Sequence, residues 1–152
     1  MIDLSPSRMA LAVTVRSAIE DDMAYVRATF EGSYKLTKNS LRKMPWAFFK
    51  MKIRPSLIDA LDGAKIFVAH NGKSIAGWIA WVPGMRYDVV RWVYVRREHR
   101  GRGVMRSLVD RAMLANRIVY VFRSPLDEGL ARWLMTTGIT SVVYEPWERW
   151  KA

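Results

Sequence analysis

The stretch VYVRREHRGRGVMRSL, residues 93–108, decides the fold of this chain. It starts as a strand, because residues 93–95 are β-branched and aromatic. Two glycines follow within the basic run 100–103, and the pattern then predicts an amphipathic helix over 104–116. The first amides of a helix have no acceptor within the helix, and the helix dipole adds partial positive charge there. A glycine loop that enters a helix start therefore predicts an anion-binding cradle.

The cradle is strongly basic, which favours a pyrophosphate as its ligand. Glycine permits positive φ and lets a ligand approach the backbone closely. The segment is not a P-loop, because no Gly-Lys-Ser/Thr follows, and a Rossmann fingerprint would need glycine at position 106. A plain glycine turn with solvated side chains remains the alternative. The cationic or titratable side chains concerned are Arg96, Arg97, His99, Arg100, Arg102 and Arg106.

The hydrophobic periodicity of the whole chain predicts an α/β (α+β) fold in the order β-α-α-β-β-β-α-β-α-β. Such an order gives a mixed sheet with helices on both faces. Asn71-Gly72, between two strand patterns, predicts a hairpin. The strands are predicted at 10–16, 65–70, 74–82, 87–95, 118–122 and 141–144, and the helices at 17–30, 39–61, 104–116 and 127–137.

The first helix has a start signal of its own. Ser17 is followed three residues later by Glu20, which predicts a capping box with Ser17 as the N-cap. The apolar face of this helix is predicted to consist of Ile19, Met23, Val26 and Phe30.

Length and composition limit the class of protein. The chain has 152 residues and 51% hydrophobic residues, which predicts a single domain over 1–152. It has no cysteine and only two histidines, so disulfides, thiolate zinc sites and a cysteine nucleophile are excluded and no metal site is predicted. No signal peptide and no membrane-spanning run is recognised, so we expect a cytoplasmic protein without a membrane partner.

Residues Arg100–Met105 resemble the acyl-CoA-binding motif of the GNAT N-acetyltransferase superfamily, R/Q-x-x-G-x-G/A. The predicted order of elements matches that superfamily from about residue 10 to residue 145. One departure is Met105, which stands where the motif has glycine or alanine. The resemblance implies a mostly antiparallel sheet in which two adjacent strands splay around the pantetheine arm of acetyl-CoA, and it includes small members of phage type.

The resemblance also implies which residues hold the cofactor. Backbone groups of Val93 and Val95 would bind the pantetheine arm, and Arg97 would meet the 3′-phosphate of the adenosine. The amides that would hold the pyrophosphate belong to Arg102, Gly103, Val104 and Met105, and Arg100 and Gly101 complete the motif.

Many members of the superfamily place a carboxylate on the motif strand to deprotonate an acceptor amine. Asp88 is the only carboxylate in 87–95 and is therefore the candidate general base. Strict alternation would place it on one face with Val90, Trp92 and Tyr94, where burial would raise its pKa. A turn residue after Tyr87 is the alternative.

The superfamily often protonates the departing thiolate with a tyrosine in the later helix, and Leu134 occupies the corresponding position. The acid is therefore missing, and this loss is consistent with altered or absent catalysis. Ser124, Tyr120, Thr136 or water could replace it.

The segment 35–54 interleaves lysines and arginines with Trp46, Phe48 and Phe49. Basic residues with aromatics suit DNA or RNA, through phosphate contacts and base stacking. The alternative is an amphipathic helix with its aromatic side chains in the core. The positive charge of this segment disfavours polyamine and aminoglycoside acceptors, which would be repelled.

Three hypotheses follow for a monomer or homodimer. The first is an acetyl-CoA-dependent N-acetyltransferase whose primary-amine acceptor is a small molecule, a protein or a nucleic-acid-linked group. The second is a DNA-base-modifying enzyme that resembles the Mom proteins of phages. The third is a non-catalytic nucleic-acid-binding or structural module on a GNAT scaffold.

Overall fold

A computed structural model describes residues 9–36, 39–83, 88–112, 118–122 and 140–144. For residues 88–89 and for the last two ranges only the backbone is described. Within these ranges the chain forms one six-stranded sheet in the order β1-β2-β3-β4-β5-β6. The strands are β1 (Thr14–Ser17), β2 (Lys65–His70), β3 (Ile75–Val82), β4 (Asp88–Val95), β5 (Ile118–Phe122) and β6 (Thr140–Tyr144).

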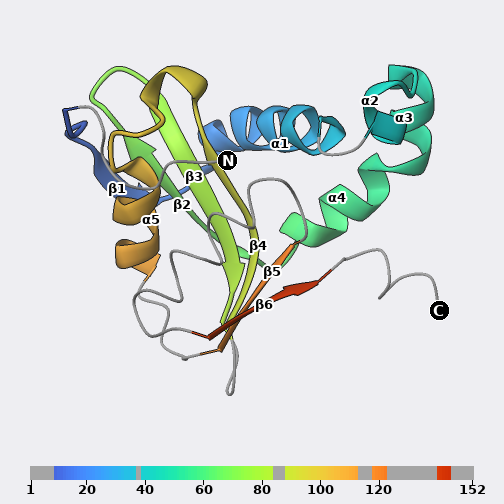
Figure 1. The fold of residues 1–152 in the computed structure, drawn as a ribbon. Coiled ribbons are helices and arrows are strands. Elements are labelled where there is room, and N and C mark those ends of the chain that lie inside the picture. Colours follow the sequence, from blue (N-terminus) through green and yellow to red (C-terminus); the bar gives the residue numbers. More distant parts are fainter. Residues whose placement is uncertain (1–8, 37–38, 84–87, 113–117, 123–139, 145–152) are drawn as a thin grey trace.

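Strands β1 to β4 pair antiparallel, and β5 pairs parallel with both β4 and β6. The predicted mixed, mostly antiparallel sheet is therefore confirmed. Helices cover both faces, with α5 on one side and α1 to α4 on the other (Figure 1). The helical segments are α1 (Glu20–Lys35), α2 (Asn39–Arg42), α3 (Trp46–Lys52), α4 (Arg54–Leu61), the 3₁₀ turn Arg97–His99 and α5 (Val104–Ala112).

The predicted helical region 39–61 consists of three short helices rather than one. Pro45 is the N-cap of α3, and Pro55 lies in the first turn of α4, where its missing N–H costs no hydrogen bond. The helix predicted at 127–137 lies outside the described residues.

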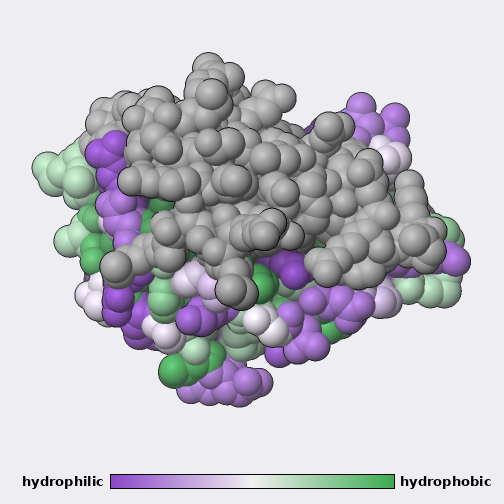
Figure 2. Space-filling view, turned by 90° about the horizontal axis from the view of Figure 1, so that it is seen from below, coloured by the Kyte–Doolittle hydropathy of each residue, from purple (hydrophilic) through white to green (hydrophobic). Residues whose placement is uncertain are grey.

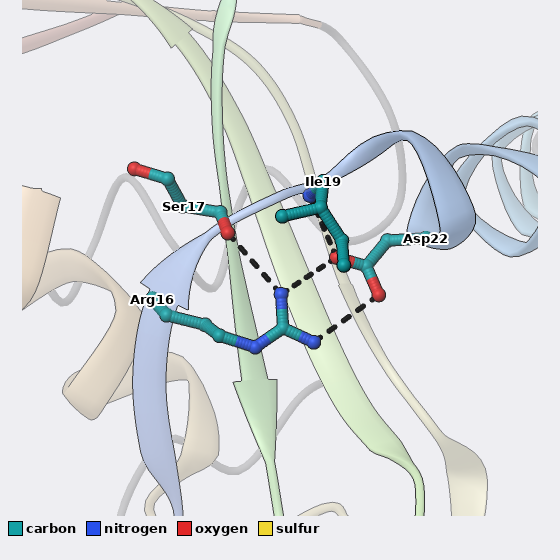
Figure 3. Close-up of polar contacts among 4 residues, drawn as sticks. All are labelled: Arg16, Ser17, Ile19 and Asp22. Atoms are coloured by element: carbon teal, nitrogen blue, oxygen red, sulfur yellow. Dashed lines mark hydrogen bonds and ion pairs between the residues drawn. The ribbon is translucent and has the colours of Figure 1, made fainter.

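The predicted start of α1 is wrong by two residues. The N-cap is Ile19, whose N–H donates to Asp22 Oδ2 at 2.8 Å. Arg16 holds the same carboxylate from strand β1, with Nη1 at 2.7 Å and Nη2 at 3.2 Å (Figure 3). Asp22, rather than Glu20, is thus the acid that reaches back to the cap. The helix therefore begins later than Ser17 indicated, and Ile19 is exposed instead of lying on the apolar face.

The Arg16–Asp22 pair joins the end of β1 to the start of α1. The side chain of Asp22 is only 9% exposed, and the hydrogen bond from Arg16 holds the pKa of its carboxyl group below the usual value. The Arg16 guanidinium also donates to the Ser17 carbonyl at 3.2 Å. This corner orients α1 across the sheet.

Two hydrophobic clusters lie on opposite faces of the sheet. Leu108 of α5 packs with Ile79 and Val93 on one face. Phe30 of α1 packs with Trp78 and Trp92 on the other. Both indole N–H groups of this second cluster are satisfied, since Trp78 Nε1 donates to Thr29 Oγ1 at 2.9 Å and Trp92 Nε1 donates to Ser33 Oγ at 3.0 Å.

Strand β4 contains a β-bulge at Arg91. The register with β3 steps from Ala80↔Trp92 to Trp81↔Val90, so Arg91 is the extra residue. Val90 consequently belongs to the α5-side cluster, whereas Trp92 belongs to the α1-side cluster. The alternation predicted for Asp88, Val90, Trp92 and Tyr94 is therefore wrong, because the bulge shifts the alternation by one residue.

Candidate functional site

The candidate site begins where β4 and β5 separate. β5 pairs with β4 only through Asp88↔Val119, Val89↔Tyr120 and Val90↔Val121. Within the described residues β4 then continues over 91–95 with no further register to β5. The separation coincides with the bulge, which twists β4 at that point. An extended chain with amide groups can pair with this part of β4 as a strand would.

The backbone groups that face the gap can be identified from the hydrogen bonds to β3. Arg96 N–H donates to the Ala76 carbonyl of β3 at 2.8 Å. In an extended strand the N–H of one residue and the C=O of the preceding residue point to opposite sides, so Val95 C=O points away from β3. Val95 and Val93 therefore present their N–H and C=O groups on the β5 side. Their role in binding the cofactor arm remains a prediction.

The chain leaves β4 through a glycine loop that ends at the start of α5. Gly101 has φ 73° and Gly103 has φ 82°, a region that other residues rarely adopt. Ser107 N–H donates to the Gly103 carbonyl at 3.1 Å, which is the first intrahelical bond of α5. The amides of Gly103, Val104 and Met105 precede this bond at the positive end of the helix dipole. The predicted glycine loop and helix start are therefore present, and anion binding by these amides stays a prediction.

Met105 does not crowd this cradle. Its side chain is 9% exposed and packs in the α5-side cluster together with Val104. The departure from the glycine or alanine of the motif therefore adds core contacts beneath the loop, and the Met105 amide stays in the first turn of α5.

Two of the motif arginines are held by backbone carbonyls. Arg100 Nε donates to Val95 O at 3.0 Å, so this side chain lies at the end of the separated part of β4. Arg102 Nε donates to Met9 O at 3.0 Å, and Leu11 N–H donates to Arg102 O at 3.0 Å. The N-terminal segment 9–11 thus fixes one side of the loop. The side chain of Arg97 is exposed and forms no hydrogen bond or ion pair with the described residues.

Gly77 is a positioning residue that the sequence analysis missed. A Cβ atom at this position would lie 2.5 Å from Tyr94 O, 3.2 Å from Val104 Cγ1 and 3.3 Å from Val95 Cα. The absence of a side chain therefore lets β3, the separated part of β4 and the start of α5 approach one another. An isolated glycine inside the strand pattern 74–82 is the sequence signal for such an approach.

The acid–base candidates are only partly described. Asp88 begins β4 and pairs with Val119, but its side chain lies outside the described set. Tyr120 is placed by its backbone alone, opposite Val89. Leu134, Ser124 and Thr136 lie outside the described residues.

A tyrosine pair that the sequence analysis did not single out lies beside the separated part of β4. The rings of Tyr25 on α1 and Tyr94 on β4 are 6.4 Å apart in an edge-on arrangement. Burial, followed by the neighbouring Tyr94, raises the pKa of the Tyr25 phenol to about 12. Tyr25 is therefore protonated at neutral pH.

Several residues of the basic and aromatic segment 35–54 form contacts that stabilise the fold. Lys35 is buried, donates from Nζ to Arg42 O at 2.7 Å and lies 5.1 Å from the centre of the Trp46 ring. Phe49 is fully buried, and Arg54 forms a bidentate ion pair with Glu31. Lys35, Phe49 and Arg54 therefore stabilise the fold. The burial of Phe49 is what the alternative interpretation expects for the aromatic side chains.

Within the described ranges, no three His, Asp or Glu side chains gather closely enough to hold a metal ion. Among the same residues, no helix combines the length and hydropathy needed to span a bilayer.

The chain matches a known family model. The model, described as an acetyltransferase (GNAT) domain, matches residues 62–137, half of the chain. This match includes β2, β3, β4, the glycine loop and α5. A search of curated proteins finds no match.

Solved structures share the fold at low sequence identity. A possible acetyltransferase from Clostridium difficile 630 has a TM-score of 0.57 at 12% identity, covering 88% of this chain and 93% of the other. A ribosomal-protein-alanine N-acetyltransferase from Brucella melitensis biovar Abortus 2308 has 0.54 at 20%, covering 80% and 90%. A spermidine N-acetyltransferase from Vibrio cholerae, solved with CoA and spermine, has 0.50 at 15%, covering 83% and 79%. At these identities the likeness shows the fold and not the acceptor.

Proposed function

The chain belongs to the acetyltransferase (GNAT) domain family, and from this premise we propose that it transfers the acetyl group of acetyl-CoA to a primary amine whose surroundings are not cationic. The family uses acetyl-CoA as cofactor, and its members are N-acetyltransferases. The acceptor, the roles of individual residues and the retention of catalysis belong to the proposal.

One observation supports the proposal most strongly. The separated part of β4 leads directly into a glycine loop and a helix start, so an edge able to pair with amide groups adjoins a cradle for phosphates. CoA has the same order of groups, an arm with two amides followed by a pyrophosphate. Val93 and Val95 would pair with the arm, and the amides of Gly103, Val104 and Met105 would bind the pyrophosphate.

The bound cofactor would supply a thioester whose carbonyl carbon accepts the amine. The chain's own contribution begins with the acceptor proton. Asp88 is the sole carboxylate of β4 and lies on the paired side of the bulge, three residues before Arg91. We assign it the role of general base, acting on the amine directly or through a water.

No family-type acid is required for the departing thiolate. An alkyl thiol has a pKa of about 8.5, so solvent can reprotonate it near neutral pH. Leu134 at the usual tyrosine position is therefore compatible with turnover.

The charge of the protein selects among acceptors. The net charge is +11, and the segments 35–62 (7 basic, 2 acidic) and 96–123 (8 basic, 2 acidic) carry most of it. A polycation such as spermidine would be repelled from this surface. An amine on a neutral or anionic carrier would not, and an acidic carrier would associate faster.

Titration calorimetry with acetyl-CoA tests the proposal. Gly103→Glu places a carboxylate in the cradle at φ 82° and should abolish binding. The matched control is Gly72→Glu, because Gly72 has φ 96° in the hairpin turn and open space around it. Both variants add the same charge and the same backbone strain. Equal acetyl-CoA affinity in the two folded variants would refute the cofactor site.

The second candidate function is a non-catalytic module, favoured by Leu134 at the acid position. It predicts acetyl-CoA binding without release of thiol from any amine tested. A screen of amines on neutral, anionic and cationic carriers, read out as free thiol, separates it from the enzyme.

A further inference from the structure

Helix α3 is exposed around almost its whole circumference. Phe49 is its single buried residue. Trp46 is 49% exposed, Phe48 is 45% exposed and Met51 is 63% exposed, although all three are large and apolar. We call this set, together with the three exposed lysines beside it, the α3 surface; it consists of Lys43, Trp46, Phe48, Lys50, Met51 and Lys52.

The lysines of the α3 surface have no acidic residue near them in the sequence. From Gly32 to Ile58 the chain contains seven basic residues and no aspartate or glutamate. Lys35 and Arg54 are used by the fold, as described above, and Arg42 donates to Leu36 O at 3.0 Å. In the described part of the chain, Lys43, Lys50 and Lys52 form no ion pair, which leaves three exposed cations for a partner. The α3 surface therefore suits an anionic partner that can also contact exposed rings.

The arrangement of rings and lysines distinguishes between anionic partners. Trp46 and Lys50, and likewise Phe48 and Lys52, are i, i+4 pairs, so each lysine lies one turn from a ring. At about 100° per residue the two rings lie roughly 200° apart along the exposed side of the helix, with Lys50 between them. The two rings therefore do not share the single continuous apolar face that a bilayer interface needs. Alternating rings and cations instead match a nucleic-acid strand, whose bases stack on rings while phosphates meet lysines.

Viewed from below, hydrophobic and hydrophilic side chains adjoin along the right-hand edge of Figure 2, the side of the molecule on which α2, α3 and α4 lie in Figure 1. Exposed rings favour unpaired bases, because a duplex buries the faces of its bases.

The α3 surface is also connected to the candidate active site by a short path of contacts. Trp92 follows the bulge residue of β4, and its ring lies 5.5 Å from that of Tyr34. The next residue, Lys35, lies against Trp46. Two residues of α1, Tyr34 and Lys35, thus link the α3 surface to Trp92 of β4.

We infer that the α3 surface binds single-stranded nucleic acid, with the Trp46–Lys50 and Phe48–Lys52 pairs each contacting one nucleotide. The binding itself is independent of catalysis. The further statement that this strand carries the acceptor amine rests on the proposed function.

Fluorescence anisotropy with a labelled oligothymidylate of about 20 nucleotides tests the inference at ~50 mM salt. The variant Lys50→Gln/Lys52→Gln removes two phosphate contacts, so the slope of log K against log salt should fall in magnitude by about 1.4. The matched control is Arg27→Gln/Lys73→Gln, which loses the same charge at exposed positions outside the α3 surface. Equal slopes for the two variants would overturn the inference, as would absence of binding by the wild type.

Phe48→Ala provides an independent variant, because Phe48 is 45% exposed and forms no ring contact with the described residues, and a stacked base should be lost. We expect affinity for the oligonucleotide to fall by roughly 5- to 150-fold, with an unchanged salt slope. Unchanged affinity would overturn the stacking. Vesicles of phosphatidylcholine and phosphatidylserine that displace the oligonucleotide and bind more tightly would assign the surface to lipid instead. Acetyl-CoA calorimetry on the same variants should be unaffected, so failure of either proposal is seen separately.

Discussion

The close approach at Gly77 makes a quantitative prediction. In Gly77→Ala the new Cβ would start 2.5 Å from the Tyr94 carbonyl oxygen, and ordinary contact distances begin near 3.4 Å. β3 and β4 must therefore move apart by several tenths of an ångström or more. This happens along the part of β4 that does not pair with β5. Overpacking of this kind costs about 1–3 kcal/mol of unfolding free energy. For a chain of this size the melting temperature should fall by roughly 2–12 °C.

The same displacement should reach the cofactor site. Val95 Cα and Val104 Cγ1 are the other atoms that the new methyl group meets, at 3.3 Å and 3.2 Å. They belong to the strand edge and to the helix start that would hold acetyl-CoA. Calorimetry should therefore show weaker acetyl-CoA binding in Gly77→Ala, by about tenfold, since misplacement costs of this order are 1–2 kcal/mol.

Gly32→Ala is the control for this prediction. Gly32 lies in α1 with nothing within 4 Å of its Cβ position, so alanine should stabilise the protein by about 0.5–1 kcal/mol. The two substitutions add the same methyl group and should shift the melting temperature in opposite directions. A Gly77→Ala protein as stable as the wild type, with unchanged acetyl-CoA affinity, would refute the reasoning.

Three further predictions concern titratable groups. Asp88→Asn should lower the rate of acetyl transfer by roughly 10²–10⁴ while acetyl-CoA affinity stays constant; a constant rate would remove Asp88 from the mechanism. Asp22→Asn should destabilise the fold at pH 7 by about 1–2 kcal/mol through loss of the charged cap. Because the folded-state pKa of Asp22 is lowered, its contribution is present above the unfolded pKa of about 3.9 and is lost as pH falls through the folded value, so urea unfolding of wild type and variant should converge in acid. With a pKa of about 12 for Tyr25, this phenol should ionise above pH 10–11, so Tyr25→Phe should leave the absorbance change of the phenols in that pH range unchanged.

Much of the fold follows from local patterns in the sequence. The hairpin at Asn71-Gly72, the strands at 65–70 and 118–122 and the start of α5 agree with the structure, because each depends on neighbouring residues alone. The start of α1 does not, since Arg16 competes for the first turn from another element and selects Asp22 as the capping acid. Sequence spacing cannot show that competition.

The bulge at Arg91 limits what could be predicted about the site. No residue along 87–95 marks a bulge in the sequence, and only the register with Ala80 and Trp81 reveals the extra residue. The glycine loop, in contrast, was predictable because positive φ at Gly101 and Gly103 is a property of glycine itself.

The sequence shows that segment 35–54 is basic and aromatic, but it does not show which of its side chains are exposed. Lys35 is buried because it donates to Arg42 O, and Phe49 is buried because it packs in the cluster that joins α1 and α4. Without these two residues, the exposed i, i+4 pairs of α3 remain as the α3 surface.

The hydrogen bonds between segment 9–11 and Arg102 bear on how the protein is made. Met9 and Arg102 are 93 residues apart, so at about 5–20 residues per second the ribosome adds Arg102 roughly 5–20 s after Met9. The loop is therefore closed only after β1 to β4 have been synthesised. A change that displaces segment 9–11 would therefore reach the glycine loop, although 93 residues separate Met9 from Arg102.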